Sequence, residues 1–188
     1  MCYTRKKNIA KAKIFSRKDN PTPEALAQRA RMKTLVQLSQ SLLPIVQKGF
    51  VGIGKGTTSN AFVASNQKAV TVDEKNVATV DFEKLLVATG LVNPPKVTVT
   101  YDEESKKYQF TQEVQEEEDG YASAEDKVYG VLYETTRGRA RLVALRERGE
   151  SGSTSCALPE EWDNTNVKVY CFATLKNGKR ASDSLLIS

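Results

Sequence analysis

The hydrophobic period of this chain changes near Val70, and that change constrains the fold more than any other feature of the sequence. From residue 23 up to this point, apolar residues recur at roughly the 3.6-residue period of a helix. Beyond it, short apolar runs alternate with polar residues and are separated by polar turns, which is typical of strands. The sequence therefore predicts an N-terminal arm over 1–19, a helical segment over 20–69 and a β-domain over 70–188.

The first expected helix runs over residues 23–41. Thr22 is a good N-cap residue, and Pro23 suits the first helical position because its missing N–H would have no partner there. Apolar residues follow at about helical spacing, so one face is expected to join the core; its members are Leu26, Ala30, Leu35, Leu38 and Leu42.

Two shorter helices are expected to follow. One covers 42–48 and stops at Gly49, because glycine readily adopts the conformation that ends a helix. The other lies near 60–69, with Thr58 or Ser59 as its cap. Together with the first helix they predict a small helical cluster joined by short links.

The β-domain is expected to consist of short strands joined by polar turns. Asn177-Gly178 is a strong two-residue hairpin signal, and residues 150–155 read as a loop. The expected strands cover 70–73, 77–89, 96–101, 107–114, 127–135, 140–148, 167–175 and 180–187.

Strands of this number and spacing favour an antiparallel β-sandwich of immunoglobulin or fibronectin III type, so the expected fold class is α+β. The pair of cysteines around a tryptophan that marks true immunoglobulin domains is absent from the sequence. Trp162 is expected to lie in the core. Arg137, Arg139 and Arg141 are expected on one face of a strand, as a second basic patch.

Charge divides the chain unevenly. Residues 1–55 carry 12 Lys/Arg and 2 Asp/Glu, a net charge of +10, whereas residues 56–188 carry 16 Lys/Arg and 21 Asp/Glu, a net charge of −5. A basic end on an acidic body predicts that the arm meets an anionic partner. That partner could be nucleic acid, an acidic protein surface, or the acidic body of a neighbouring copy.

The residues expected to contact the partner lie in the arm and on the first helix. The arm interleaves basic residues with apolar ones, and the helix adds two arginines. The candidates are Arg5, Lys6, Lys7, Ile9, Lys11, Lys13, Ile14, Phe15, Arg17, Lys18, Arg29 and Arg31. The interleaving favours docking on protein, since a tail that binds only phosphate would not need apolar residues.

Nothing in the sequence predicts an enzyme, a metal site or a cofactor. The chain has no histidine, which is the commonest general base and metal ligand. The glycine-rich run over 49–57 resembles a phosphate-binding loop, but Gly56 stands where a Mg²⁺-binding hydroxyl is needed and the run follows a helix. The three cysteines are expected to be reduced thiols. No signal peptide or membrane-spanning run is recognisable.

The chain resembles an uncharacterised bacterial family known only as a domain of unknown function. The resemblance covers about residues 20–188 and leaves the basic arm unexplained. It rests on short motifs: Asn20-Pro21-Thr22-Pro23, Ala27-Gln28-Arg29, Leu42-Leu43-Pro44, Gly49-Phe50, Asn60-Ala61-Phe62, Leu158-Pro159, Trp162, Val167 to Phe172, Asn177-Gly178 and Ser182 to Ser184. The start of the first helix is also similar to that of small phage structural proteins. The family lends no catalytic residues.

These patterns predict a non-enzymatic structural or assembly protein, a phage or prophage virion component that docks through its basic arm. Its expected partners are other structural subunits or copies of itself, with no membrane and no small-molecule substrate. The expected location is the cytoplasm or a virion. The alternative is a nucleic-acid-binding protein that uses the arm and the first helix.

Overall fold

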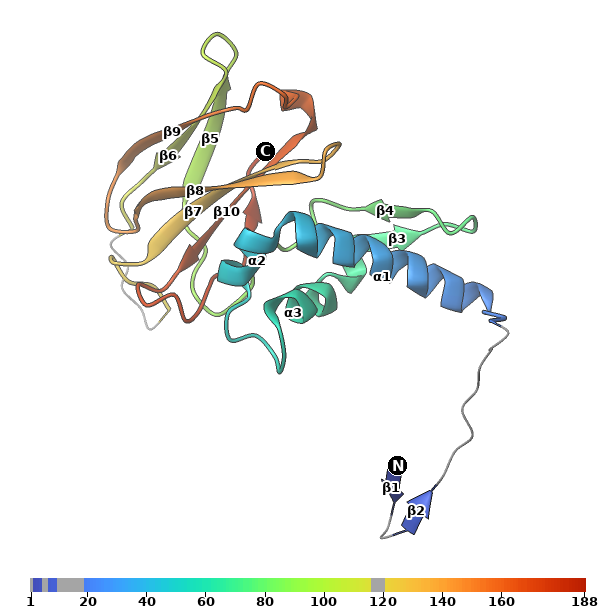
Figure 1. Ribbon diagram of the computed structural model, residues 1–188. Coiled ribbons are helices and arrows are strands. Elements are labelled where there is room, and N and C mark those ends of the chain that lie inside the picture. Colours follow the sequence, from blue (N-terminus) through green and yellow to red (C-terminus); the bar gives the residue numbers. More distant parts are fainter. Residues whose placement is uncertain (1, 5–6, 10–18, 116–120) are drawn as a thin grey trace.

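The computed structural model describes residues 2–4, 7–9, 19–115 and 121–188. N-terminal helices are followed by antiparallel β-sheets, which confirms an α+β fold (Figure 1). In the arm, β1 (Cys2–Thr4) and β2 (Lys7–Ile9) form an antiparallel pair.

The helices form close to where their capping residues predict. Helix α1 (Pro23–Ser41) has Thr22 as its N-cap, and the Thr22 hydroxyl accepts a hydrogen bond from the Ala25 amide at 3.3 Å. Helix α2 (Leu43–Gly49) follows directly. Helix α3 (Thr58–Ser65) is capped by Thr57, one residue before the expected caps, and a 3₁₀ turn, η1 (Gln67–Ala69), follows it.

The core face of α1 is narrower than the sequence pattern suggests. Leu35, Leu38 and Leu42 are buried as expected, but Leu26 is 38% exposed. Leu26 and Leu35 are nine residues apart, which is two and a half helical turns, so they point to opposite sides of the helix. The expectation that Leu26 joins the core is therefore wrong.

The β-strands make two larger antiparallel sheets and one small hairpin. The four-stranded sheet has the order β11-β10-β7-β8, the three-stranded sheet has the order β5-β6-β9, and β3 pairs with β4. The strands are β3 (Val70–Val72), β4 (Ala78–Val80), β5 (Val97–Asp102), β6 (Lys107–Gln112), β7 (Lys127–Glu134), β8 (Arg139–Glu147), β9 (Gly152–Ala157), β10 (Val167–Thr174) and β11 (Leu185–Leu186).

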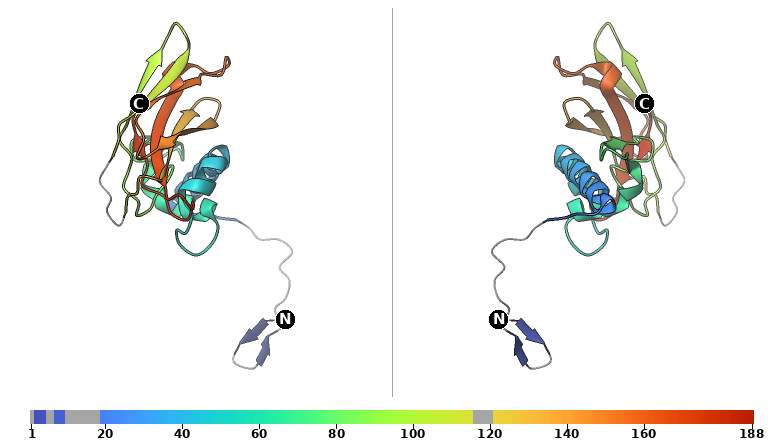
Figure 2. Two further views of the ribbon diagram at one scale, coloured as in Figure 1. Left: turned by 90° about the vertical axis from the view of Figure 1, so that its left-hand side faces the viewer. Right: turned by 90° about the vertical axis from the view of Figure 1, so that its right-hand side faces the viewer.

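The four-stranded sheet is the middle layer, because its central strands bury side chains on both faces. Val131, Tyr170 and Phe172 pack into a core with the helices, which contribute Leu35 and Phe62 among others. The alternate positions of the same strands pack against the three-stranded sheet in a second core, made by Val97, Phe110, Val128, Leu132, Cys156, Val169 and Cys171. The helices therefore cover one face of the middle sheet and β5, β6 and β9 cover the other (Figures 1 and 2).

The helices and the strands share the first of these cores. Ala69 and Val70, on either side of the expected boundary at residue 70, are both buried in it. The helical core therefore continues into the β-sheet. The division of the chain into a helical segment and a β-domain at residue 70 stays a prediction.

Three strand expectations need correction. Residues 150–155 are not a loop throughout, because β9 begins at Gly152 and pairs with β6 over its whole length. The expected strand over 77–89 shrinks to β4, since Leu85, Val87 and Ala88 are buried outside any strand. The expected strand over 180–187 is reduced to isolated bridges and the two residues of β11. Trp162, expected in the core, is half-buried and packs against the inter-sheet core.

Candidate functional site

The structure places only part of the predicted contact set. Lys7 and Ile9 lie in β2, and Arg29 and Arg31 lie on α1. The remaining candidates fall outside the described residues: Arg5, Lys6, Lys11, Lys13, Ile14, Phe15, Arg17 and Lys18.

Arg29 binds the residue at which the arm meets the helix. Its Nη1 donates to Asp19 Oδ2 at 2.6 Å and its Nη2 to Asp19 Oδ1 at 3.1 Å, a two-pronged contact. Both side chains are more than half exposed. The hydrogen bond from Arg29 lowers the pKa of Asp19, so the carboxylate is charged at neutral pH. The contact places Asp19, the last residue of the arm, beside the second turn of α1.

Arg31 contacts a different part of the chain, since it links α1 to the β3–β4 hairpin. Its Nε donates to the carbonyl of Val70 at 3.1 Å, and its Nη1 donates to Gln28 Oε1 at 3.0 Å. The side chain is partly buried between the two elements. The Arg31 guanidinium therefore stabilises the packing of α1 against β3.

Arg137, Arg139 and Arg141, expected as a second basic patch, make contacts with neighbouring strands and loops. Arg137 and Arg139 place their Nη1 atoms 3.2 Å and 3.6 Å from Glu161 Oε2, and Arg141 Nη1 donates to the Ala157 carbonyl at 2.9 Å. Because the single charge of Glu161 lies close to two of the three guanidinium groups and offsets one of their charges, this surface is less basic than the sequence suggests.

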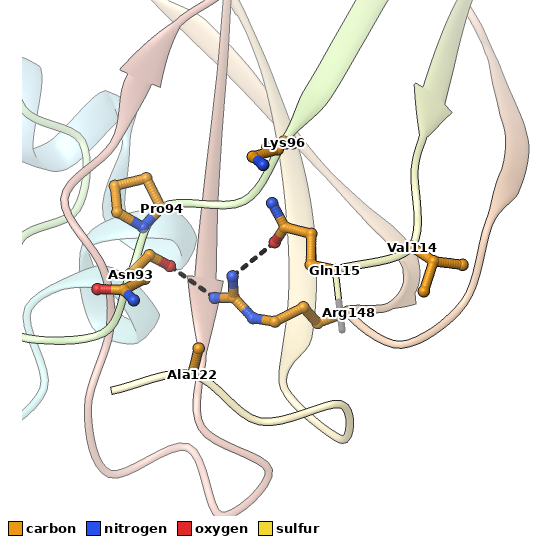
Figure 3. A pocket seen from close by; sticks show the side chains of 7 residues that line it. All are labelled: Asn93, Pro94, Lys96, Val114, Gln115, Ala122 and Arg148. Atoms are coloured by element: carbon orange, nitrogen blue, oxygen red, sulfur yellow. Dashed lines mark hydrogen bonds between the residues drawn. The ribbon is translucent and has the colours of Figure 1, made fainter. Parts of the chain in front are cut away.

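The most elaborate polar arrangement surrounds Arg148, just after β8 (Figure 3). Its guanidinium donates from Nε to Asp126 Oδ2 at 3.1 Å, from Nη1 to Gln115 Oε1 at 2.6 Å, and from Nη2 to the Asn93 carbonyl at 2.6 Å. The Arg148 and Asp126 side chains are 2% and 1% exposed. One buried cation thus ties together four segments that are distant in the sequence.

A cavity of about 460 Å³ opens beside this guanidinium. Figure 3 shows Lys96, Gln115 and Asn93 around it, with Pro94, Val114 and Ala122 completing the described lining. Arginine keeps its proton at any ordinary pH and cannot act as a base. Because the described lining offers hydrogen-bond donors but no nucleophile paired with a base, the arrangement is suited to holding the fold together.

No sequence pattern singles out Arg148. Arg146 and Arg148 both belong to an arginine-rich hairpin, yet Arg146 is exposed and Arg148 is buried. A buried partner, Asp126, lies 22 positions away in the sequence. No local signal marks such a pair.

Other sites for chemistry are few in the part of the chain that the structure describes. The described residues contain no group of three or more metal-ligating side chains. Cys156 and Cys171 are free and buried; burial raises the pKa of Cys156, and raises that of Cys171 to about 12, which suppresses the reactive thiolate. None of the described helices combines the length and apolarity that crossing a membrane requires.

The chain belongs to a family of unknown function, DUF6266, whose profile matches residues 5–188. The match confirms the resemblance and extends it, because it includes the arm from Arg5 onward. A comparison with curated proteins gives no significant match. Among solved structures, the chain is similar to the adhesin domain of Epf from Streptococcus pyogenes, with 18% identity and a TM-score of 0.33. That match covers 52% of this chain and 32% of the other, so it spans only about a third of the adhesin structure.

Proposed function

We propose that this DUF6266 protein is a non-enzymatic structural or assembly protein that docks through its basic N-terminal arm. The observation that carries the proposal is the separation of charge between a +10 end and a −5 body. Opposite charges on two parts of one chain favour contacts between copies, or with another acidic subunit, and speed their encounter. The Arg29–Asp19 contact supports this role because it holds the base of the arm on α1.

The family match supplies a second line of support. It includes residues 5–19, so the arm belongs to the sequence pattern of the family and is no unrelated extension. The apolar residues of the arm, Ile9, Ile14 and Phe15, fit a protein surface better than a phosphate backbone. A phage or prophage particle, and a cytoplasmic or virion location, stay predictions within this proposal.

We also propose that the body is a variant of the immunoglobulin or fibronectin III sandwich. Its support is a four-stranded and a three-stranded antiparallel sheet that bury a common core between them. Helices α1–α3 cover the outer face of the four-stranded sheet, which in a free-standing sandwich faces solvent. Such a domain commonly joins or decorates assemblies, and this step is an analogy of fold.

Nucleic-acid binding is the rival function, and the contacts of the helix arginines count against it. Arg29 is engaged by Asp19, and Arg31 donates to the Val70 carbonyl. On α1 this leaves Lys33, which is exposed, so most phosphate contacts would have to come from the arm. If about five phosphates were neutralised on duplex DNA, the binding constant would fall with salt at a log–log slope of about −4.5.

The direct test is deletion of residues 1–18, which keeps Asp19 and the whole described body. We expect light scattering to show an assembly for the full chain and a monomer for the truncated chain, with the same far-UV circular dichroism per residue from 19 onward. A full chain that is monomeric at every concentration would refute docking between copies.

A pair of arm variants separates docking from nucleic-acid binding. One removes apolar residues, Ile9→Ser with Ile14→Ser, and the other removes charges, Lys6→Gln with Lys11→Gln. Docking on protein predicts that the apolar variant dissociates at least as readily as the charge variant, because buried apolar area is insensitive to salt screening. If the charge variant alone loses binding and the apolar variant keeps it, the nucleic-acid function replaces the proposed one.

A further inference from the structure

A hollow of about 570 Å³ lies between the β5–β6 turn and the segment that joins β9 to β10. Its walls combine half-buried apolar and aromatic side chains, Tyr101, Leu158 and Trp162, with carboxylates at its rim. We call this hollow the acidic groove; its acidic members are Glu103, Glu160, Glu161 and Asp163. The β5–β6 turn and the β9–β10 segment that flank it lie at the end of the molecule remote from the N-terminal end of α1 (Figure 1).

The residues that line the acidic groove carry a net negative charge, although Arg137 and Arg139 lie beside it on Glu161. Lys106 is the one cation among its lining residues, against four carboxylates. Glu161 is shared with Arg137 and Arg139, but Glu103 and Glu160 form no ion pair with any described residue. Asp163 accepts hydrogen bonds from the Thr165 amide at 3.0 Å and the Thr165 hydroxyl at 2.8 Å, which lower its pKa and keep it ionised.

The two walls of the groove are tied to each other. The Leu158 amide donates to the Lys106 carbonyl at 2.9 Å, and the Tyr108 hydroxyl donates to Asn164 Oδ1. The rings of Tyr101 and Tyr108 pack with their centroids 4.8 Å apart. A surface that is already formed loses little conformational freedom when a ligand binds, so the groove is prepared for a partner.

We propose that the acidic groove binds the basic arm of a second copy of this chain. This inference rests on the proposed function and names the surface that receives the arm. Residues 1–18 hold seven Lys/Arg and no Asp/Glu, interleaved with Tyr3, Ile9, Ile14 and Phe15. The groove offers the matching chemistry: carboxylates for the cations, and the faces of Trp162 and Tyr101 for cation–π and apolar contact.

The position of the groove favours a second copy as the occupant. The arm leaves α1 at the Asp19–Arg29 contact, and the groove lies at the other end of the molecule. An arm that enters the groove of the next copy makes a head-to-tail contact. Such contacts between identical chains produce a closed ring or an open filament, depending on the rotation between copies.

The test neutralises the two rim carboxylates that have no described ion pair, Glu103→Gln with Glu160→Gln. Both are exposed, so the fold should tolerate the change. The matched control is Glu74→Gln with Glu83→Gln, two exposed carboxylates near the β3–β4 hairpin. We expect the groove variant to associate at least about tenfold more weakly than the full chain, judged from the coupling of close interface charges, and the control to associate normally.

Mixing two defective chains gives the decisive result. The chain lacking residues 1–18 keeps its groove, and the Glu103→Gln, Glu160→Gln chain keeps its arm. Each should be monomeric alone at concentrations where the full chain assembles, and an equimolar mixture should form one-to-one dimers in light scattering. Arm-dependent assembly that the groove variant leaves unchanged, or a mixture that stays monomeric, overturns this inference while the proposed function stands. A monomeric full chain overturns this inference together with the docking between copies on which it rests.

Discussion

Replacing Arg148 with methionine tests whether the buried cation holds the fold together. The substitution keeps most of the aliphatic stem but removes three hydrogen bonds, to Asp126, Gln115 and the Asn93 carbonyl. It also leaves the Asp126 carboxylate, whose side chain is 1% exposed, without its cation. Breaking a buried ion pair by removing one partner costs about 3–5 kcal/mol.

A loss of this size is a large part of the stability of a domain, which is typically about 5–15 kcal/mol. The second oxygen of Asp126, Oδ1, has no hydrogen-bond partner among the described residues, so the site has no spare donor to compensate. Asp126 Oδ2 would keep the Ser123 amide, at 3.0 Å, as its remaining partner. We therefore expect Arg148→Met to lower the free energy of unfolding by about 4 kcal/mol, the middle of the range for a broken buried ion pair.

Urea denaturation followed by the fluorescence of Trp162, the single tryptophan, measures the change. Arg146→Met is the matched control, because Arg146 is exposed near the end of β8, two residues before Arg148, and should change the unfolding free energy by no more than about 0.5 kcal/mol. Adding Asp126→Asn to Arg148→Met should recover part of the loss, since it removes the unpaired charge. If Arg148→Met lowers the free energy of unfolding by less than about 1 kcal/mol, the buried guanidinium does not stabilise the fold in this way.

Three further predictions concern packing and titration. Gly130→Ala should lower the free energy of unfolding in urea by about 1–3 kcal/mol, because the added Cβ would lie 2.7 Å from the Phe110 ring. When Phe110→Leu is added to the same chain, the combined loss should be less than the sum of the two single losses. Thr22→Ala should cost about 1 kcal/mol in the same assay through the lost N-cap of α1. The raised pKa of Cys171 means that folding favours its protonated thiol; that stability is present below pH 9 and is lost towards pH 12, so Cys171→Ala should flatten the alkaline part of a stability–pH curve.

Elements fixed by neighbouring residues could be predicted from the sequence. Thr22 and Pro23 specify the start of α1 locally, and the hairpin of β5 and β6 is encoded by alternation and a short polar turn. Strand β9 could not be found in this way, because Gly152, Ser153 and Ser155 have the composition of a loop. Its pairing with β6, some 40 residues earlier in the chain, makes it a strand.

The layered arrangement was present in the sequence in a form that is easy to overlook. Strand β10 is a nearly unbroken apolar run, VKVYCFAT, and all but Lys168 are buried. A strand with both faces buried shows such a run, whereas a strand with one solvent-facing side alternates. The run therefore indicates cover on both faces, which the helices and the three-stranded sheet supply. The Arg148 contacts could not be predicted, since they join residues through the fold alone.

The same layering restricts where another subunit can attach. The four-stranded sheet has no free face, because helices cover one side and the three-stranded sheet the other. The outward positions of the three-stranded sheet are polar and exposed, among them Thr98, Gln109 and Ser153, so that face offers no apolar patch to bury. Edge strand β8 carries Arg139, Arg141 and Arg146, and charged side chains of this kind discourage edge-to-edge pairing. With the sheet faces and this edge unsuited to association, the described surfaces agree with the proposed contact between the arm and the acidic groove.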